Sequence, residues 1–293
     1  MVGLVAAVVV VVGAGLLFAV RSPGPQNAGE RVRRAGAETI SYGVDDTGKA
    51  DPQRVADLWL PEGSGPHPVA VVIHGGFWRA EYSRDLMDEV SADLARRGWA
   101  AWNIEYRRVG SGGGWPQTFE DVAAAVDYLK TLAGSRSLDL GRVVTIGHSA
   151  GGHLALWAAS RHRIAAGEPG ADPAVRPRMA VGQAAVSNLA EAARARVGGT
   201  AVPSLLGGMP DAVGERYATA SPAELLPTGV ALLLVHGRDD DLVPLSQSEG
   251  YAAAARGSGD SVDFEIRDGG HFEHLDPDSE MWAAAVSGIG RIR

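Results

Sequence analysis

Residues 142–153 read Arg-Val-Val-Thr-Ile-Gly-His-Ser-Ala-Gly-Gly-His. The apolar run 143–146 leads directly into Gly147-His148-Ser149-Ala150-Gly151, and a helix-forming stretch, 154–159, follows. In so tight a strand-to-helix turn, side chains two positions before and after the serine would clash, and glycine at both positions removes the clash. The pattern predicts that Ser149 occupies a strained corner in front of a helix N-terminus.

This G-x-S-x-G pattern has a plain alternative, a glycine-rich turn with a capping serine. The chain has 39 glycines in 293 residues, so the expected number of chance matches to this pattern is roughly 0.3. The flanking strand and helix favour the nucleophile elbow of a serine hydrolase. That reading requires a base, an orienting acid and oxyanion donors elsewhere in the chain.

A candidate oxyanion loop follows the apolar run 69–73. It reads His74-Gly75-Gly76-Phe77-Trp78, the H-G-G type of loop that follows such a strand in lipases and esterases. Glycine lets main-chain N–H groups approach a developing oxyanion. Gly75 or Gly76 is the expected donor, with Phe77 as a further candidate, together with the N–H of Ala150. His74 is expected to order the loop.

The candidate acid lies in a run of three aspartates, Asp239, Asp240 and Asp241, directly after the apolar run 230–235. One of them can cap the helix that follows, and another can simply be solvated. The residues alone leave all three open.

The candidate base is His271, because it follows the last predicted strand within Asp268-Gly-Gly-His-Phe272. Serine hydrolases of this order place the histidine last in the chain, after the serine and the acid. His274, three residues later, is the alternative.

The composition excludes several other classes of site. A net charge of −8 without basic clusters argues against a nucleic-acid partner. The absence of cysteine excludes disulfides, thiol nucleophiles and zinc sites built from cysteine. A serine hydrolase needs no cofactor and no metal, so none is expected.

The N-terminus predicts a separate segment. Residues 1–20 contain no charged side chain, and twenty apolar residues are long enough to span a bilayer or to serve as a secretory segment. Residues 21–37 are expected to be a linker. A membrane-anchored or exported protein is therefore expected. The alternative is a wrongly assigned start near residue 35, which would leave the protein cytoplasmic.

Residues 38–293 alternate strand and helix signals, which indicates an α/β fold with a mainly parallel central sheet and helices on both faces. Residues 187–228 are irregular and are a candidate small cap. The expected strands are 39–42, 54–60, 69–73, 100–104, 143–146, 179–183, 230–235 and 262–266. The expected helices are 83–97, 118–132, 154–159, 244–255 and 279–288.

Taken together, four segments resemble the α/β-hydrolase superfamily: 74–78, 147–152, 236–244 and 269–272. The His-Gly-Gly-Phe-Trp loop is similar to that of the esterase and arylformamidase-like branch, which is related to carboxylesterases of the hormone-sensitive-lipase type. The resemblance implies the α/β-hydrolase fold. It also implies Ser149, Asp240 and His271 as a catalytic triad, and its His-Gly-x-x-Asp spacing selects Asp240.

The expected substrate is a small-molecule ester or amide. Phe77, Trp78 and Trp115 are candidates to line its pocket, and ordinary packing is the alternative for each. The leading interpretation is a carboxylesterase for small or medium acyl groups. The alternatives are an amide-bond hydrolase, arylformamidase-like or a peptidase, and a non-catalytic, membrane-tethered binding protein.

Overall fold

The computed structural model describes residues 36–45 and 47–292. The predicted apolar segment 1–20, and the linker up to residue 35, lie outside the described residues. Within the described ranges, no helix is both long and apolar enough to cross a membrane.

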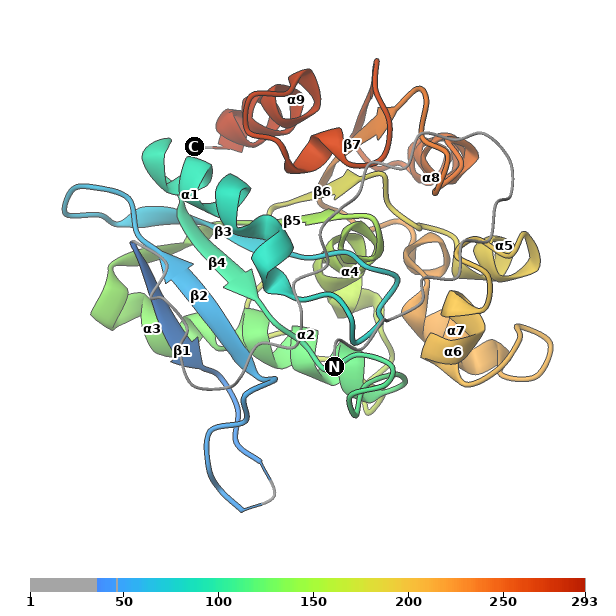
Figure 1. Cartoon of the computed structure of the whole chain (residues 1–293), viewed down its shortest axis with the longest axis horizontal. Coiled ribbons are helices and arrows are strands. Elements are labelled where there is room, and N and C mark those ends of the chain that lie inside the picture. Colours follow the sequence, from blue (N-terminus) through green and yellow to red (C-terminus); the bar gives the residue numbers. More distant parts are fainter. Residues whose placement is uncertain (1–35, 46, 293) are drawn as a thin grey trace, which may run out of the picture. The chain divides into compact units, whose positions relative to one another are not determined.

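The described residues form an eight-stranded sheet with the strand order β1-β2-β4-β3-β5-β6-β7-β8 (Figure 1). β2 is antiparallel to both β1 and β4, and the other neighbouring pairs are parallel. The predicted α/β class with a mainly parallel sheet is therefore confirmed. The strands are β1 Ala37–Ser41, β2 Val55–Trp59, β3 His67–Ile73, β4 Ala100–Ile104, β5 Leu138–His148, β6 Met179–Gln183, β7 Ala231–Gly237 and β8 Val262–Arg267.

Helices cover both faces of this sheet, because the inner strands carry apolar side chains on both sides. In β3, Val69, Val71 and Ile73 pack with α2, α3 and α4, whereas Ala70 and Val72 pack with α1 and α9. α8 joins α4 on the first of these faces. The helices are α1 Asp88–Arg96, α2 Gln117–Asp127, α3 Leu129–Arg136, α4 Ala150–Ser160, α5 Leu189–Arg194, α6 Ala201–Leu206, α7 Gly214–Ala220, α8 Ser246–Gly257 and α9 Glu280–Ile289.

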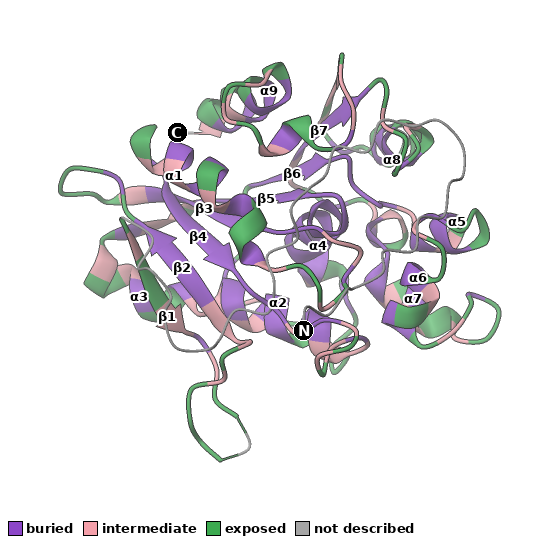
Figure 2. Cartoon of the chain, viewed as in Figure 1, coloured by how far each residue is buried: buried purple, intermediate pink, exposed green. Residues whose placement is uncertain are grey.

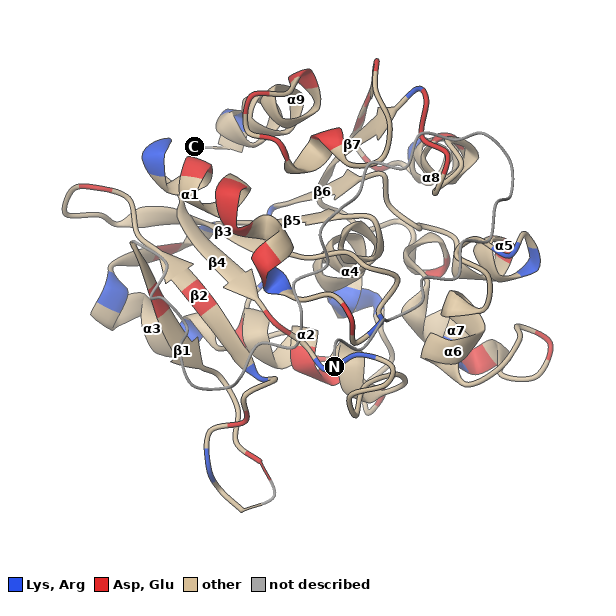
Figure 3. Ribbon diagram, viewed as in Figure 1, with Lys and Arg blue, Asp and Glu red and all other residues tan. Residues whose placement is uncertain are grey.

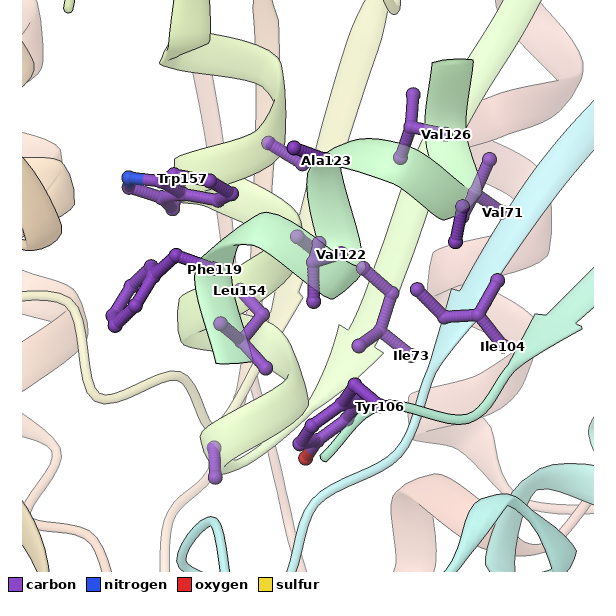
Figure 4. Close-up of a cluster of buried hydrophobic side chains, with 14 of the residues drawn as sticks. Val71, Ile73, Ile104, Tyr106, Phe119, Val122, Ala123, Val126, Leu154 and Trp157 are labelled. Atoms are coloured by element: carbon purple, nitrogen blue, oxygen red, sulfur yellow. The ribbon is translucent and has the colours of Figure 1, made fainter. Parts of the chain in front are cut away.

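Burial is concentrated in the central strands and in α4 (Figure 2). Figure 4 shows the larger cluster, in which Phe119 and Val122 of α2 meet Leu154 and Trp157 of α4 above Ile73 of β3. Every residue of α4 is buried. The helix that follows Ser149 is therefore held on all sides, which fixes the position of its first turn.

Several expected elements differ in extent from those observed, among them the helix expected over 154–159, which begins at Ala150. β5 begins at Leu138, because its polar first half pairs with β3 across a register shift between Pro68 and Val69. The helix expected over 118–132 is divided at Tyr128, whose φ of −62° and ψ of −22° are typical of a 3-10 turn. The helix expected from residue 83 starts as a 3-10 turn, Arg84–Met87, before α1.

The candidate cap, residues 187–228, contains the short helices α5, α6 and α7, which lie together in Figure 1. Two side chains of α4 hold its C-terminal part. His153 Nε2 donates to the carbonyl oxygen of Ala220 at 2.9 Å, and Trp157 Nε1 donates to that of Thr219 at 3.0 Å. The segment is thus fixed to the same helix that begins beside Ser149.

Candidate active site

The sharp turn predicted at Ser149 joins β5 to α4. Ser149 has φ 57° and ψ −120°, a conformation that residues with a side chain rarely adopt. A Cβ added to Gly147 would lie 2.1 Å from the carbonyl oxygen of Gly151, and one added to Gly151 would lie 2.1 Å from that of Ile73. The N–H of Ser149 donates to the carbonyl oxygen of Gln183 at 2.7 Å. Glycine is therefore required on both sides of a serine that two neighbouring strands hold in place.

At the same edge of the sheet, the structure brings Asp240 and His271 together. His271 Nδ1 donates to Asp240 Oδ2 at 2.7 Å, and the Asp240 carboxylate is fully buried. The residues Asp239 and Asp241 are exposed. A carboxylate on Nδ1 keeps that nitrogen protonated and leaves the Nε2 lone pair available as a base. Nε2 makes no hydrogen bond with any described residue, Ser149 included.

Asp240 receives further donors that keep it ionised. Its Oδ1 accepts from the N–H groups of Leu242 and Val243, both at 2.9 Å, and His236 Nε2 lies 3.3 Å from Oδ2. Burial opposes ionisation, but hydrogen bonds from His236, His271 and the Val243 N–H hold the pKa of the Asp240 carboxyl well below its usual range.

The ring of His236 is itself oriented by a hydroxyl. Its Nε2 faces two acceptors, the Val243 carbonyl oxygen at 3.0 Å and Asp240 Oδ2, so Nε2 carries the proton. Its Nδ1 accepts from Ser248 Oγ at 2.7 Å. A buried chain of contacts therefore runs from α8 to the carboxylate that holds His271.

His148 connects the elbow to the loop that carries His271. Its Nε2 donates to the His271 carbonyl oxygen at 2.7 Å, and the two rings lie 4.5 Å apart between centroids. Burial, followed by the charges of His271 and His274, lowers the pKa of His148 well below its usual value, which keeps its ring neutral. The elbow and the His271 loop are thus joined directly, although 123 residues separate the two histidines in the chain.

The loop after β3 approaches Ser149 closely. A Cβ added to Gly75 would lie 3.1 Å from Ser149 Cβ and 2.7 Å from the His148 carbonyl oxygen. Gly76 has φ +102°, and a Cβ there would lie 2.4 Å from the Tyr82 side chain. Among the described residues, the N–H groups of Gly75 and Gly76 have no hydrogen-bond acceptor. Free N–H groups beside a serine can donate hydrogen bonds to the oxyanion that forms during acyl transfer.

His74 orders this loop, as its sequence position suggests. Its Nε2 lies 2.9 Å from Glu105 Oε1, its ring stacks on Tyr106 at 4.4 Å, and the Tyr106 hydroxyl donates to its carbonyl oxygen at 2.9 Å. Burial would raise the pKa of the Glu105 carboxyl, but the charge and hydrogen bond of His74, followed by Arg108, lower it to about 2.

The three predicted pocket residues occupy different environments. Trp78 is fully buried, and its Nε1 donates to His153 Nδ1 at 3.2 Å, so its ring belongs to the core. Phe77 is half-buried beneath the Arg79 guanidinium, 5.7 Å from the ring centroid. Trp115 is half-buried against Phe119. Phe77 and Trp115 remain candidates to line a pocket, whereas Trp78 packs beneath the loop.

Two exposed aromatic residues beside the site were missed by the sequence reasoning. Phe272 is 60% exposed, and its ring meets that of His271 edge to face at 5.3 Å. Tyr82 is exposed and packs against Gly76. The position of Phe272 next to His271 was a usable signal, whereas Tyr82 had none. In the described part of the chain, no group of three or more His, Asp and Glu side chains is placed to hold a metal ion.

Comparison with known proteins adds a family and a fold. The family described as BD-FAE matches residues 56–254. Two curated relatives come from Mycobacterium tuberculosis. The probable carboxylic ester hydrolase LipM is 29% identical over 229 residues, covering 74% of this chain and 51% of its own length. Esterase LipC is 26% identical over 219 residues, covering 70% of this chain and 53% of its own length. The chain thus spans about half the length of the curated relatives it matches.

Solved structures of similar fold include a truncated carbohydrate esterase from gut microbiota, with a TM-score of 0.76 at 19% identity over 87% of this chain and 94% of the other. Esterase B from Lactobacillus rhamnosis has a TM-score of 0.74 at 18% identity over 88% of this chain and 85% of the other. These likenesses confirm the predicted α/β-hydrolase fold.

Proposed function

Because the chain belongs to the BD-FAE family, we propose that it is a serine hydrolase that cleaves carboxylic esters of small or medium acyl groups. The observation that carries the proposal is the 2.7 Å hydrogen bond between His271 Nδ1 and buried Asp240, at the edge of the sheet where Ser149 occupies its strained turn. The ester-hydrolase names of LipM and LipC support the choice of substrate class.

In the first step, Ser149 Oγ attacks the acyl carbonyl and His271 Nε2 takes the serine proton. Asp240 holds the Nδ1–H and stabilises the imidazolium that forms. The protonated Nε2 then gives its proton to the alkoxy oxygen as the ester bond breaks, which leaves the acyl group on Ser149 and releases the alcohol.

The tetrahedral intermediate carries its negative charge on the former carbonyl oxygen. We assign the N–H groups of Gly75, Gly76 and Ala150 as its donors, because Gly75 lies against Ser149 and Ala150 begins α4. Losing one such donor typically slows an enzyme by roughly 10²–10³. In the second step, water gives a proton to His271 Nε2 and attacks the acyl group. His271 then returns the proton to Ser149 Oγ as the bond between the acyl carbon and Oγ breaks, which restores Ser149 and releases the acid.

The test combines a fluorophosphonate probe with an activity panel. The wild type should be labelled and should hydrolyse p-nitrophenyl esters, and Ser149→Ala should do neither while unfolding at the same temperature. Equal labelling of both proteins would refute Ser149 as the nucleophile. No labelling of either would also refute it and would favour a binding protein. Strong turnover of formylkynurenine or dipeptide amides with negligible ester turnover would replace the ester proposal with an amide-bond hydrolase.

A further inference from the structure

A pocket of about 340 Å³ lies at the edge of the sheet opposite to Ser149. It is lined by His162, by residues 176–178, which directly precede β6, and by residues 229–231, which lead into β7. Both strands run parallel to β5, so these residues stand at the amino ends of the strands, whereas Ser149 stands at the carboxyl end of β5. A five-residue strand is roughly 16 Å long. The pocket is therefore separate from the proposed active site.

The charge of this pocket is not balanced by the residues that surround it. Acidic and basic side chains are interspersed over the described domain (Figure 3), and most of its arginines contact a carboxylate or a carbonyl oxygen. Arg163, Arg176 and Arg178 have no such side-chain partner among the described residues, and no Asp or Glu lines the pocket. The carboxylate of Asp260 accepts from the N–H groups of residues 228 and 229 and is therefore already engaged.

The state of His162 is consistent with a local excess of positive charge. Its ring is half-buried, and burial, followed by the charges of Arg176 and Arg163, lowers its pKa. Arg176 and Arg178 both line this pocket and are both exposed. Arginine suits planar or tetrahedral oxyanions, because its guanidinium group offers several N–H donors in a fixed fork. The volume also lies within the range of small-molecule sites.

We propose that this pocket binds a phosphate group, either free or as a small phosphomonoester, through Arg176 and Arg178 with His162 beside them. The site lies on the far edge of the sheet, so its occupancy does not depend on the proposed hydrolase activity. Bound phosphate would compensate two like charges that otherwise repel each other, and it would favour the protonated form of His162.

The test measures the unfolding temperature of the full chain against inorganic phosphate and, separately, glycerol 3-phosphate, with sodium chloride holding the ionic strength constant. Both anions should raise the unfolding temperature of the wild type in a saturable way. The half-maximal concentration should rise about tenfold or more in Arg176→Gln and in Arg178→Gln, since each loses a charged hydrogen-bond donor. A lower half-maximal concentration for glycerol 3-phosphate would identify the phosphomonoester as the preferred form, and equal values would identify the phosphate group alone.

Arg196→Gln is the matched control, because Arg196 is an exposed arginine with no described side-chain partner that lies outside the pocket. It should keep the wild-type response. Phosphate should also move the NMR titration of the His162 ring to higher pH in the wild type and in Arg196→Gln, but not in Arg176→Gln or Arg178→Gln. No saturable response in the wild type, or the same response in all four proteins, would overturn the proposal.

Discussion

Replacing His236 by phenylalanine should move the acidic limb of the pH dependence of kcat/KM to higher pH. The substitution removes one of the four donors that contact Asp240, the Nε2–H at 3.3 Å. With fewer donors, the carboxylate keeps more of its negative charge for His271 and stabilises the imidazolium more strongly. The active, neutral form of His271 then needs a higher pH.

The size of this shift follows from the geometry. A hydrogen bond to a charged group contributes about 1.5–3 kcal/mol, but the His236 contact is long and shares its proton with the Val243 carbonyl oxygen. We therefore expect about 1 kcal/mol, which moves the limb by about 0.5–1 pH unit. The variant also leaves Ser248 Oγ and the Val243 carbonyl oxygen without this partner, at a cost of about 1–3 kcal/mol each in the free energy of unfolding.

The assay is kcat/KM for a p-nitrophenyl ester between pH 5 and 9, on protein shown by urea unfolding to be folded throughout. Ser248→Ala should give a smaller shift in the same direction, because it loosens the ring without removing the Nε2–H. Tyr251→Phe, also in α8, alters a buried hydroxyl that has no partner among the described residues, and it should leave the limb in place. An unchanged limb in a folded His236→Phe variant, or a limb at lower pH, would refute the reasoning.

Four further predictions concern stability, pH, substrate and location. Gly151→Ala should lower the free energy of unfolding by several kcal/mol or prevent folding, because its Cβ would meet a main-chain oxygen at 2.1 Å. The control is Gly250→Ala, which lies in open space within a helix and should raise the free energy of unfolding by about 0.5–1 kcal/mol. Both are measured by denaturant titration. The lowered pKa of Glu105 contributes about 3 kcal/mol to the free energy of unfolding. This contribution is present above the usual pKa of 4.5 and is lost as the pH falls towards about 2. The free energy of unfolding of Glu105→Gln should therefore vary less between pH 5 and 3 than that of the wild type. Phe272→Ala should raise KM for aromatic esters several-fold and leave the unfolding temperature unchanged, because its side chain is largely exposed; an unchanged KM would remove it from the substrate site. Deleting residues 1–22 should move a tagged protein from the membrane or exported fraction to the soluble fraction, and identical fractionation would reject the proposed anchor or signal.

The elbow and its neighbouring loops could be predicted because steric demands act over a few adjacent residues. Glycine at 147 and 151 is dictated by main-chain atoms within the turn and at the end of β3. The choice of Asp240 over its neighbours could not be derived in this way. It depends on the turn in which Oδ1 accepts from the N–H groups of residues 242 and 243, and on a histidine 31 positions away.

The environment of Trp78 was equally hidden from the sequence. Phe77 and Trp78 both have positive φ, 51° and 55°, so the chain coils and turns the second ring inward to His153. No periodic pattern of apolar residues reports such a turn. The contact between His148 and the His271 main chain was missed for a related reason, since it links two loops that meet only through the strand order of the sheet.

The attachment of residues 187–228 to α4 has a consequence for how this protein can diversify. The segment is fixed at its beginning by Ser187 Oγ, which donates to the Gln247 carbonyl oxygen. Its C-terminal part is fixed by the hydrogen bonds from His153 and Trp157. Between these anchors the segment is also tied to the loop after β3 and to the approach to α2, because Arg79 donates to the Gly198 carbonyl oxygen at 2.9 Å and the Trp115 N–H donates to that of Leu205 at 2.7 Å. A change of length within residues 187–228 would therefore strain the loop that carries Gly75 and Gly76, so divergence here should proceed by replacing exposed side chains rather than by insertion or deletion.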